Sequence, residues 1–303
     1  MGVRDTIAKA LMGIKAYHSS PHTFDRFDLS KIGTGEGAQV YGHGLYFAEN
    51  PKVSGQGGEY WNQFLRRFEG TSEGHAAGRL RAEGWDREKA LAAAQRDAAD
   101  WEQLLANARP DQTKYFTQMR DMRRGEAELL ASGAPVGPRT YEVEIKADPV
   151  RFLDWDKPLI EQSPAVQNAV EPFAQSKWGD SGASLYRSSG LPRHPVAASR
   201  VLSEAGIPGI KYLDEGSRNL ASNIAQADSI IAAGGVRGRG ASSIDDWVKQ
   251  KAEWQQTPQT SNYVVFNPDI VDIKKMYGFA GAPGAAAAAM GSTYDPSQYE
   301  VTP

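Results

Sequence analysis

The chain has 303 residues, of which 40% are hydrophobic and 23% charged, and its formal net charge at pH 7 is −3. These values are ordinary for a globular protein, and the small net charge excludes a strong overall attraction to nucleic acid or anionic lipid. The chain contains no cysteine, which excludes disulfides, thiolate metal sites and cysteine nucleophiles. No stretch reaches the roughly 18 consecutive apolar residues of a membrane-spanning helix.

The first half of the chain changes character twice. Apolar residues recur at helical spacing in residues 3–15, which predicts a short helix. Residues 16–48 are rich in glycine and loop-forming residues and end in the strand-like sequence GLYFA. The segment 70–138 is predicted to be a helical insertion of amphipathic helices, one of which stops at Pro110.

The second half alternates strands with short helices. Ser163 and Pro164 predict the start of one helix, and Gly206 predicts the end of another. Short helical pieces and a Gly/Arg loop are expected between the last two strands. The tail, residues 281–303, is low in complexity and is predicted to be flexible. Strands are predicted at 43–48, 140–146, 151–155, 209–213 and 262–267. Because strands and helices do not alternate regularly, we expect an α+β fold, with a single domain over residues 1–280.

Several familiar kinds of site are excluded by their missing context. The sequence GTGEGA resembles a dinucleotide-binding loop only loosely, because no predicted strand precedes it and no clear helix follows. His18 and His22 are four residues apart, but Pro21 between them disfavours the helix that a zinc site would need. The five histidines lack metal-ligand spacing, so we expect no metal site.

Three segments in order, YHSS, GHGLYFAENPKVSGQGGEYW and SNYVVFNPDI, carry a resemblance. They resemble the motif strands of ADP-ribosyltransferases of the diphtheria-toxin and poly(ADP-ribose)-polymerase type. The chain resembles even more closely the ADP-ribosyltransferase domain of large polyvalent proteins from phages and mobile elements, through FDLSKIGTGEGAQVYGHGLYFAEN, LDWDKPLIEQSPAVQNAV, AASRVLSEAGIPGIKYLDEGSR and NYVVF. The resemblance covers about residues 16–60 and 140–275 and implies a split mixed β-sheet with a helical insertion.

The resemblance also implies roles for particular residues around NAD⁺ as the substrate. His18 would bind a ribose hydroxyl, the backbone of Ser19 and the hydroxyl of Ser20 would hold the nicotinamide carboxamide, and Tyr46 and Tyr60 would clamp the nicotinamide ring. Stacking of aromatic rings on a cationic pyridinium is favourable. The alternative is that Tyr60 and its neighbour Trp61 are core aromatics.

Further residues complete the expected site. Gly42 and Gly44 would let the backbone approach the ligand closely, while Glu36 and Gln39 would line its adenosine side. Asn262 would contact the reacting ribose. It stands where the toxins and polymerases place a glutamate, so it lacks the full negative charge that stabilises a developing cation.

The expected activity is therefore mono-ADP-ribosylation, with transfer of ADP-ribose from NAD⁺ to a host macromolecule and release of nicotinamide. The acceptor would be a protein or nucleic acid in the bacterial cytosol, with delivery by a phage as one route, and no membrane is involved. Two alternatives remain: a non-catalytic NAD⁺- or ADP-ribose-binding module, which the neutral Asn262 favours, and a structural or adaptor protein of a phage particle.

Overall fold

The protein combines strands with helices in two compact units, and neither unit is continuous in sequence. The computed structural model describes residues 13–32, 39–174, 181–187, 190–235 and 242–277. Within these described ranges, the first unit contains residues 13–14, those from 29 to 50 and those from 146 to 270, and the second contains residues 15–28, 51–145 and 271–277. The expected α+β class is therefore confirmed at the level of a mixed α+β protein.

Four strands of the first unit lie in the order β4-β5-β6-β2. They are β2 (Leu45–Ala48), β4 (Leu153–Asp154), β5 (Gly209–Leu213) and β6 (Ser261–Val265). β4 and β5 are parallel, whereas β6 is antiparallel to both β5 and β2. Tyr263, Val264 and Val265 of β6 are all buried, as expected for an inner strand that is covered on both faces.

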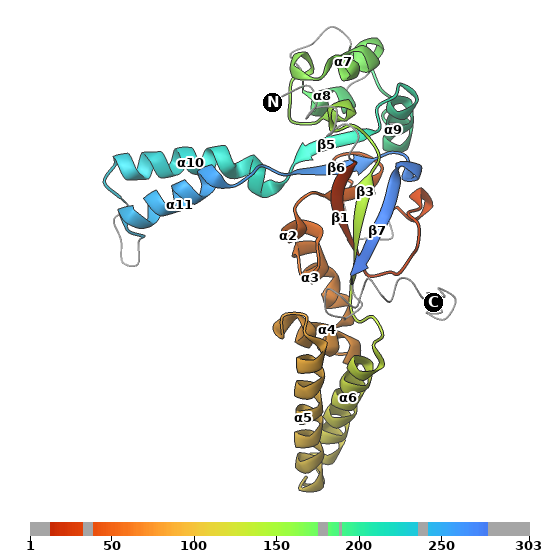
Figure 1. The fold of residues 1–303 in the computed structure, drawn as a ribbon, viewed down its shortest axis with the longest axis vertical. Helices are drawn as coiled ribbons and strands as arrows, with labels where there is room; N and C mark the ends of the chain where they lie inside the picture. The colour runs from red at the N-terminus through yellow and green to blue at the C-terminus, as the bar shows by residue number, and fades with distance from the viewer. Residues whose placement is uncertain (1–12, 33–38, 175–180, 188–189, 236–241, 278–303) are drawn as a thin grey trace. The chain divides into compact units, whose positions relative to one another are not determined.

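Three helices pack against the apolar core of the first unit (Figure 1). They are α7 (Pro164–Val170), α8 (Gly182–Tyr186) and α9 (Pro195–Glu204). The Ser163 hydroxyl accepts a hydrogen bond from the Val166 N–H, which confirms the predicted cap of α7. Val166 and Leu202 are fully buried in this core, and each such side chain stabilises the unit by about 1.5–3 kcal/mol.

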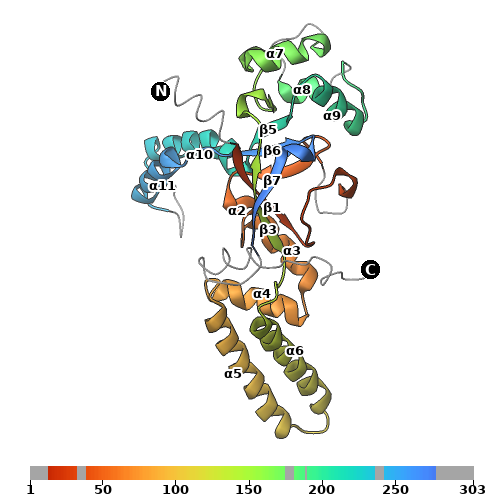
Figure 2. The same ribbon diagram turned by 45° about the vertical axis from the view of Figure 1, so that its right-hand side comes forward.

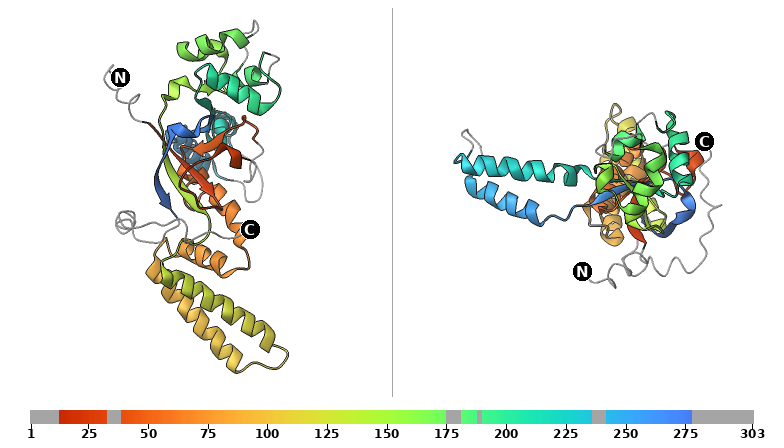
Figure 3. Two further views of the ribbon diagram at one scale, coloured as in Figure 1. Left: turned by 90° about the vertical axis from the view of Figure 1, so that its right-hand side faces the viewer. Right: turned by 90° about the horizontal axis from the view of Figure 1, so that it is seen from above.

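Two long helices of the first unit, α10 (Glu215–Ala232) and α11 (Ile244–Gln256), lie side by side (Figure 3). The prediction of only short helical pieces in this segment is wrong. Asp214 caps α10 by accepting the Ser217 N–H at 2.6 Å, and Ser243 forms a capping box with Asp246 at the start of α11. These local caps, together with packing of the two helices, stabilise more helix than the apolar pattern alone indicated.

The strands of the second unit follow the order β1-β3-β7. They are β1 (Ile14–Ser20), β3 (Arg139–Ile145) and β7 (Val271–Tyr277). β3 and β7 are antiparallel, and their register shifts between Glu142 and Val143. Glu142 accepts hydrogen bonds from Tyr277 at 2.7 Å and pairs with Lys15 at 3.0 Å.

The second unit is otherwise helical, and its helices confirm the helical character predicted for residues 70–138. They are α2 (Pro51–Ser54), α3 (Glu59–Leu65), α4 (Ser72–Ala82), α5 (Arg87–Ala106) and α6 (Thr113–Ser132). α5 and α6 run side by side (Figure 2). Ala90 and Ala94 of α5 are fully buried with Leu80, Leu130 and Trp61, so small residues on α5 let its neighbours approach closely.

A buried carboxylate, Glu126 of α6, lies inside this helical part. Its side chain has no exposed surface, and its two oxygens accept hydrogen bonds from Arg79 Nε at 2.5 Å and Arg123 Nη1 at 2.9 Å. Arg123 Nη1 also donates to Nδ1 of His75 at 3.1 Å, which assigns a neutral imidazole. Burial and the positive charge of Arg123 lower the pKa of His75.

Other predicted elements differ from the structure or lie outside the described residues. Most of the helix predicted for residues 3–15 lies outside the described residues, but Ile14 and Lys15 belong to strand β1 rather than to a helix. The strand predicted at 151–155 shrinks to Leu153–Asp154, because Asp148 caps a 3-10 turn over Pro149–Arg151. The tail from residue 281 also lies outside the described residues. None of the described helices has the length and apolar character that crossing a membrane requires.

We expect Glu126→Gln to destabilise the protein by about 3 kcal/mol, because the neutral amide leaves Arg123 without its buried counter-charge and Arg79 with Asp97 alone. Urea denaturation followed by circular dichroism measures this loss. Glu128→Gln on the same helix is the control, since Glu128 is exposed and should change the free energy of unfolding by less than about 0.5 kcal/mol. Equal effects of the two substitutions would contradict the prediction.

The lowered pKa of His75 makes stability depend on pH in one direction. The unfolded chain takes up a proton at this histidine near its usual pKa of 6.5, before the folded chain does. The stabilisation from neutral His75 is therefore complete above that pH and declines as the pH falls toward the lower folded pKa. Urea denaturation of the wild type and His75→Gln at several pH values should show a difference that shrinks on acidification. A constant difference would contradict this.

Candidate functional site

The site residues predicted from the sequence are found in both units. The first unit holds Gln39, Gly42, Gly44, Tyr46 and Asn262. The second unit holds His18, Ser19, Ser20 and Tyr60. Glu36 lies outside the described residues.

One face of the first unit's strands carries Tyr46 and Asn262. In the register, Tyr46 lies opposite Val264, and Asn262 lies opposite both Ala48 and Tyr212. Side chains that are directly opposite, or two residues apart along a strand, point to the same face. Tyr46, Asn262 and Tyr212 therefore share one face on three neighbouring strands.

Hydrogen bonds and ring contacts fix the tyrosines of this face. The Tyr46 hydroxyl donates to the Gly42 carbonyl at 2.8 Å and accepts from the Tyr41 N–H at 3.2 Å. The Tyr41 ring stacks on Tyr212 with centroids 3.8 Å apart, and the Tyr46 ring meets Tyr212 edge-on at 6.5 Å. Arg218 donates to the Tyr41 hydroxyl at 2.7 Å. The result is a preorganised aromatic group rather than a set of mobile side chains.

Asn262 is the unusual member of this face. Its Oδ1 atom is buried and has no hydrogen-bond partner among the described residues. A buried acceptor without a donor costs about 1–3 kcal/mol, so such atoms are rare unless something else satisfies them. A ligand hydroxyl or N–H group is the kind of donor that this oxygen could accept from.

The two glycines before β2 are required by the chain's own packing. Gly42 has a φ of +114°, and a Cβ there would lie 3.0 Å from the Tyr186 ring. A Cβ on Gly44 would lie only 2.6 Å from the Val265 carbonyl oxygen and 2.7 Å from Val264 Cγ1. Close approach of β2 to β6 therefore accounts for Gly44 without a ligand.

Gln39 and His43 face each other across the turn that leads into β2. The Gln39 side-chain oxygen lies 3.1 Å from Nδ1 of His43, so this nitrogen carries the hydrogen. Gln39 adopts a φ of +46°, in the left-handed region. Burial and, to a smaller extent, the nearby His194 lower the pKa of His43. This pair orders the turn that contains Gly42.

Glu49 is a residue that the motif comparison did not single out. Its carboxylate accepts the Tyr263 hydroxyl at 2.8 Å and the Ser261 N–H at 2.8 Å. Burial, together with this carboxylate, raises the pKa of Tyr263. Glu49 thereby holds the residues on either side of Asn262. The only sequence signal was its position directly after GLYFA.

In the second unit, His18 lies in an aromatic group. Its ring is 5.2 Å from Phe27, in an edge-on arrangement, and 6.3 Å and 6.4 Å from Phe24 and Tyr141. Phe24 and Tyr141 stack with centroids 4.2 Å apart. The half-buried imidazole is thus oriented by packing, as a ligand-binding histidine would need to be.

Ser19 and Ser20 follow His18 and are both buried. The Ser19 N–H donates to Ser54 Oγ at 3.0 Å, and the Ser19 hydroxyl donates to the Ser54 carbonyl at 3.0 Å. A ligand carboxamide would have to displace Ser54 to reach this N–H. Ser20 Oγ accepts the His22 N–H at 3.1 Å, which leaves the hydrogen of its hydroxyl able to donate.

Tyr60 and Trp61 of α3 differ sharply in burial. Trp61 is 1% exposed, and its Nε1 donates to the Pro138 carbonyl at 2.8 Å, so it is a core residue. Tyr60 is 39% exposed. The alternative that both are core aromatics therefore holds for Trp61 and not for Tyr60.

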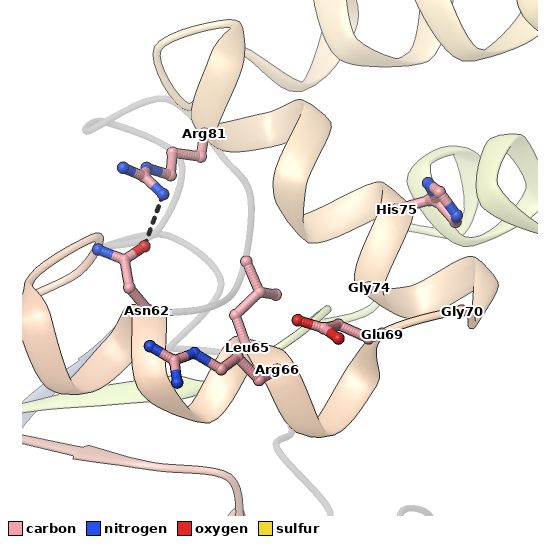
Figure 4. A pocket seen from close by; sticks show the side chains of 8 residues that line it. All are labelled: Asn62, Leu65, Arg66, Glu69, Gly70, Gly74, His75 and Arg81. Atoms are coloured by element: carbon pink, nitrogen blue, oxygen red, sulfur yellow. Dashed lines mark hydrogen bonds between the residues drawn. The ribbon is translucent and has the colours of Figure 1, made fainter.

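A cavity of about 350 Å³ also lies in the second unit, among α3, α4 and the turn between them (Figure 4). Its charged lining includes Arg66, Glu69 and Arg81, and Arg81 donates to Asn62 at 2.6 Å. Both signs of charge are present, and none of the predicted site residues that the structure describes lines it. No group of three or more potential metal ligands occurs in the described parts of the chain.

Comparison with known proteins adds no assignment. No protein-family model matches the chain, and neither the curated proteins nor the solved structures provide a match.

We expect Gly44→Ala to destabilise the first unit by about 1–3 kcal/mol, because the new methyl group would force β2 away from β6. Thermal unfolding followed by circular dichroism tests this. Gly216→Ala is the control: its Cβ would lie 3.5 Å from the nearest atom, in the first turn of α10. Alanine is favoured over glycine in helices, so this variant should be at least as stable as the wild type.

Proposed function

We propose that this protein is a mono-ADP-ribosyltransferase, which transfers ADP-ribose from NAD⁺ to a macromolecular acceptor and releases nicotinamide. The observation that carries the proposal is the unpartnered Oδ1 of Asn262 on the same face as Tyr46 and Tyr212. The resemblance of the three motif segments, which include Tyr46 and Asn262, supports it. The acceptor would be a protein or nucleic acid of a bacterial host.

The chemistry explains what such a site must supply. The bond between ribose C1′ and the nicotinamide nitrogen breaks, and its electron pair leaves with nicotinamide, which becomes neutral. C1′ gains oxocarbenium character until an acceptor nucleophile bonds to it and loses a proton to solvent. The protein has to hold the ring and the sugar in place and to stabilise positive charge near the ribose.

Asn262 and Tyr46 would perform these tasks in the first unit. The Asn262 oxygen would accept a hydrogen bond from a ribose hydroxyl, which places the negative end of the amide dipole near the developing cation. Burial strengthens such a bond relative to water. The Tyr46 ring would contact the pyridinium, an attraction of about 1–2 kcal/mol when the pair is desolvated.

The residues of the second unit take their proposed roles from the resemblance. His18 would bind a ribose hydroxyl, Ser20 would donate to the carboxamide oxygen, and Tyr60 would contact the nicotinamide ring. Exposure of Tyr60 and the free hydroxyl hydrogen of Ser20 suit these roles. Ser19 would contribute only after its N–H leaves Ser54.

A second candidate is binding of NAD⁺ or ADP-ribose without turnover. The neutral side chain of Asn262 favours it, because an amide stabilises a cation less than a carboxylate does. The two candidates differ in one observable: only the transferase releases nicotinamide.

Two labels test the proposal on the full chain. NAD⁺ labelled in the nicotinamide ring should yield free nicotinamide, and NAD⁺ labelled in the adenine should label macromolecules of a bacterial lysate. Saturable NAD⁺ binding without nicotinamide release would support the second candidate. Absence of both binding and release would overturn both.

Variants then assign the site. We expect Tyr46→Ala and His18→Ala to lower nicotinamide release by about 10²-fold, the order found when one transition-state contact is removed. Asn262→Ala should lower it by about tenfold, which corresponds to about 1.4 kcal/mol in the barrier. Asn262→Glu should raise it by restoring a charge. His22→Ala, which removes an exposed histidine near His18, is the control and should behave as the wild type.

A further inference from the structure

A second cavity, of about 460 Å³, lies wholly within the first unit. It is formed by the turn before β2, the end of α8 and the start of α9. Its lining consists of Gln39, Val40, Gly42, Tyr186, Arg187, Arg193 and Pro195. Among the residues that the structure describes, both charged ones in this lining are arginines, so this part of the lining presents positive charge and no carboxylate.

Arg187 and Arg193 supply the positive charge of this lining. Neither Arg187 nor Arg193 forms a side-chain hydrogen bond or ion pair with any residue that the structure describes. The Arg187 guanidinium lies 4.9 Å from the centroid of the Trp155 ring, which orients it without using its N–H groups. A guanidinium group with free N–H donors matches the geometry of phosphate oxygens, and stacking holds that of Arg187 in place, whereas Arg193 is exposed.

Hydrogen bonds of Tyr186 hold one wall of the cavity in place without a ligand. The Tyr186 hydroxyl accepts the His43 N–H at 3.3 Å and lies 3.1 Å from the Pro195 carbonyl and 3.0 Å from Ser199 Oγ. One residue therefore ties together the turn before β2 and the start of α9. This fixed wall places the backbones that carry the two arginines beside one cavity, so that ordering their side chains is the main entropic cost of binding a common ligand.

We propose that this cavity binds a diphosphate group carried by a nucleotide. Two guanidinium groups balance the charge of a diphosphate esterified at both ends and offset most of that of a terminal diphosphate, and the apolar side chains of Val40 and Pro195 leave room for an attached organic group. The diphosphate has two possible sources, a free nucleoside diphosphate or NAD⁺ itself. Binding of NAD⁺ in this cavity rests on the proposed function. Gly42 connects the cavity with the proposed nicotinamide site, because it lines the cavity and its carbonyl accepts a hydrogen bond from the Tyr46 hydroxyl.

Isothermal titration of the full chain with pyrophosphate, ADP and NAD⁺ tests the proposal. Pyrophosphate and ADP should both bind, and added salt should weaken their binding. The double variant Arg187→Gln/Arg193→Gln should weaken both by at least about tenfold, and the Lys/Lys double variant should fall between, because lysine keeps the charge but not the paired donors.

Arg200→Gln is the matched control, an exposed arginine of α9 that is paired with Glu204 outside the cavity, and it should bind as the wild type does. Thermal unfolding checks that each variant is folded. Wild-type affinity in a folded Gln/Gln variant, or no binding of pyrophosphate and ADP to the wild type, would overturn the proposal.

Competition between ADP and NAD⁺ distinguishes the two sources of the diphosphate, and comparison with nicotinamide release tests the cavity and the transferase separately. Displacement of ADP by NAD⁺ assigns the diphosphate of NAD⁺, whereas arginine-dependent ADP binding that NAD⁺ does not disturb assigns a free nucleotide. Arginine-dependent ADP binding in a protein that releases no nicotinamide would leave the cavity assigned and overturn the transferase. Nicotinamide release together with ADP binding that depends on neither arginine would support the transferase and overturn the assignment of the cavity.

Discussion

The pairing of β6 with both β5 and β2 is the constraint on which the first unit's site depends. It places Asn262 between Ala48 and Tyr212, and it puts Tyr46 two residues further along the same face. A slip of one residue would turn Asn262 to the opposite face. Glu49 opposes such a slip, because its carboxylate binds the Ser261 N–H and the Tyr263 hydroxyl at the same time. The aromatic group and the unpartnered amide are thus consequences of register.

Much of the secondary structure could be predicted because its signals are local. Ser163 and Pro164 start α7 where their chemistry indicates, and alternating apolar residues mark β3. The long helices α10 and α11 were missed because their stability also comes from each other, through packing and the ion pair of Lys251 with Asp228. A single-sequence pattern does not contain that partner.

The candidate site divides in a similar way. The residue types of the motif segments were visible in the sequence, but their partners were not. Gly44 looked like a place for a ligand to approach, whereas the Val265 carbonyl already fills the space that its missing side chain would need. Ser19 looked free, whereas Ser54, 35 residues away, takes its N–H. Tyr41 stacks on Tyr212, and Arg218 binds the Tyr41 hydroxyl, but the sequence assigned a role to neither residue because the fold brings them together across 177 positions of the chain.

The buried carboxylate of Glu126 also affects how the helical part of the second unit unfolds. Arg79 of α4 and Arg123 of α6 both hold this one group, and Arg79 reaches Asp97 of α5 as well. If α4 detached alone, Glu126 would keep Arg123, but it would lose its bond to Arg79, and Arg79 would lose both of its carboxylates. Opening of α4 is therefore coupled to α5 and α6 through one guanidinium group, and we expect amide hydrogens in the middle of the three helices to exchange with solvent at similar rates.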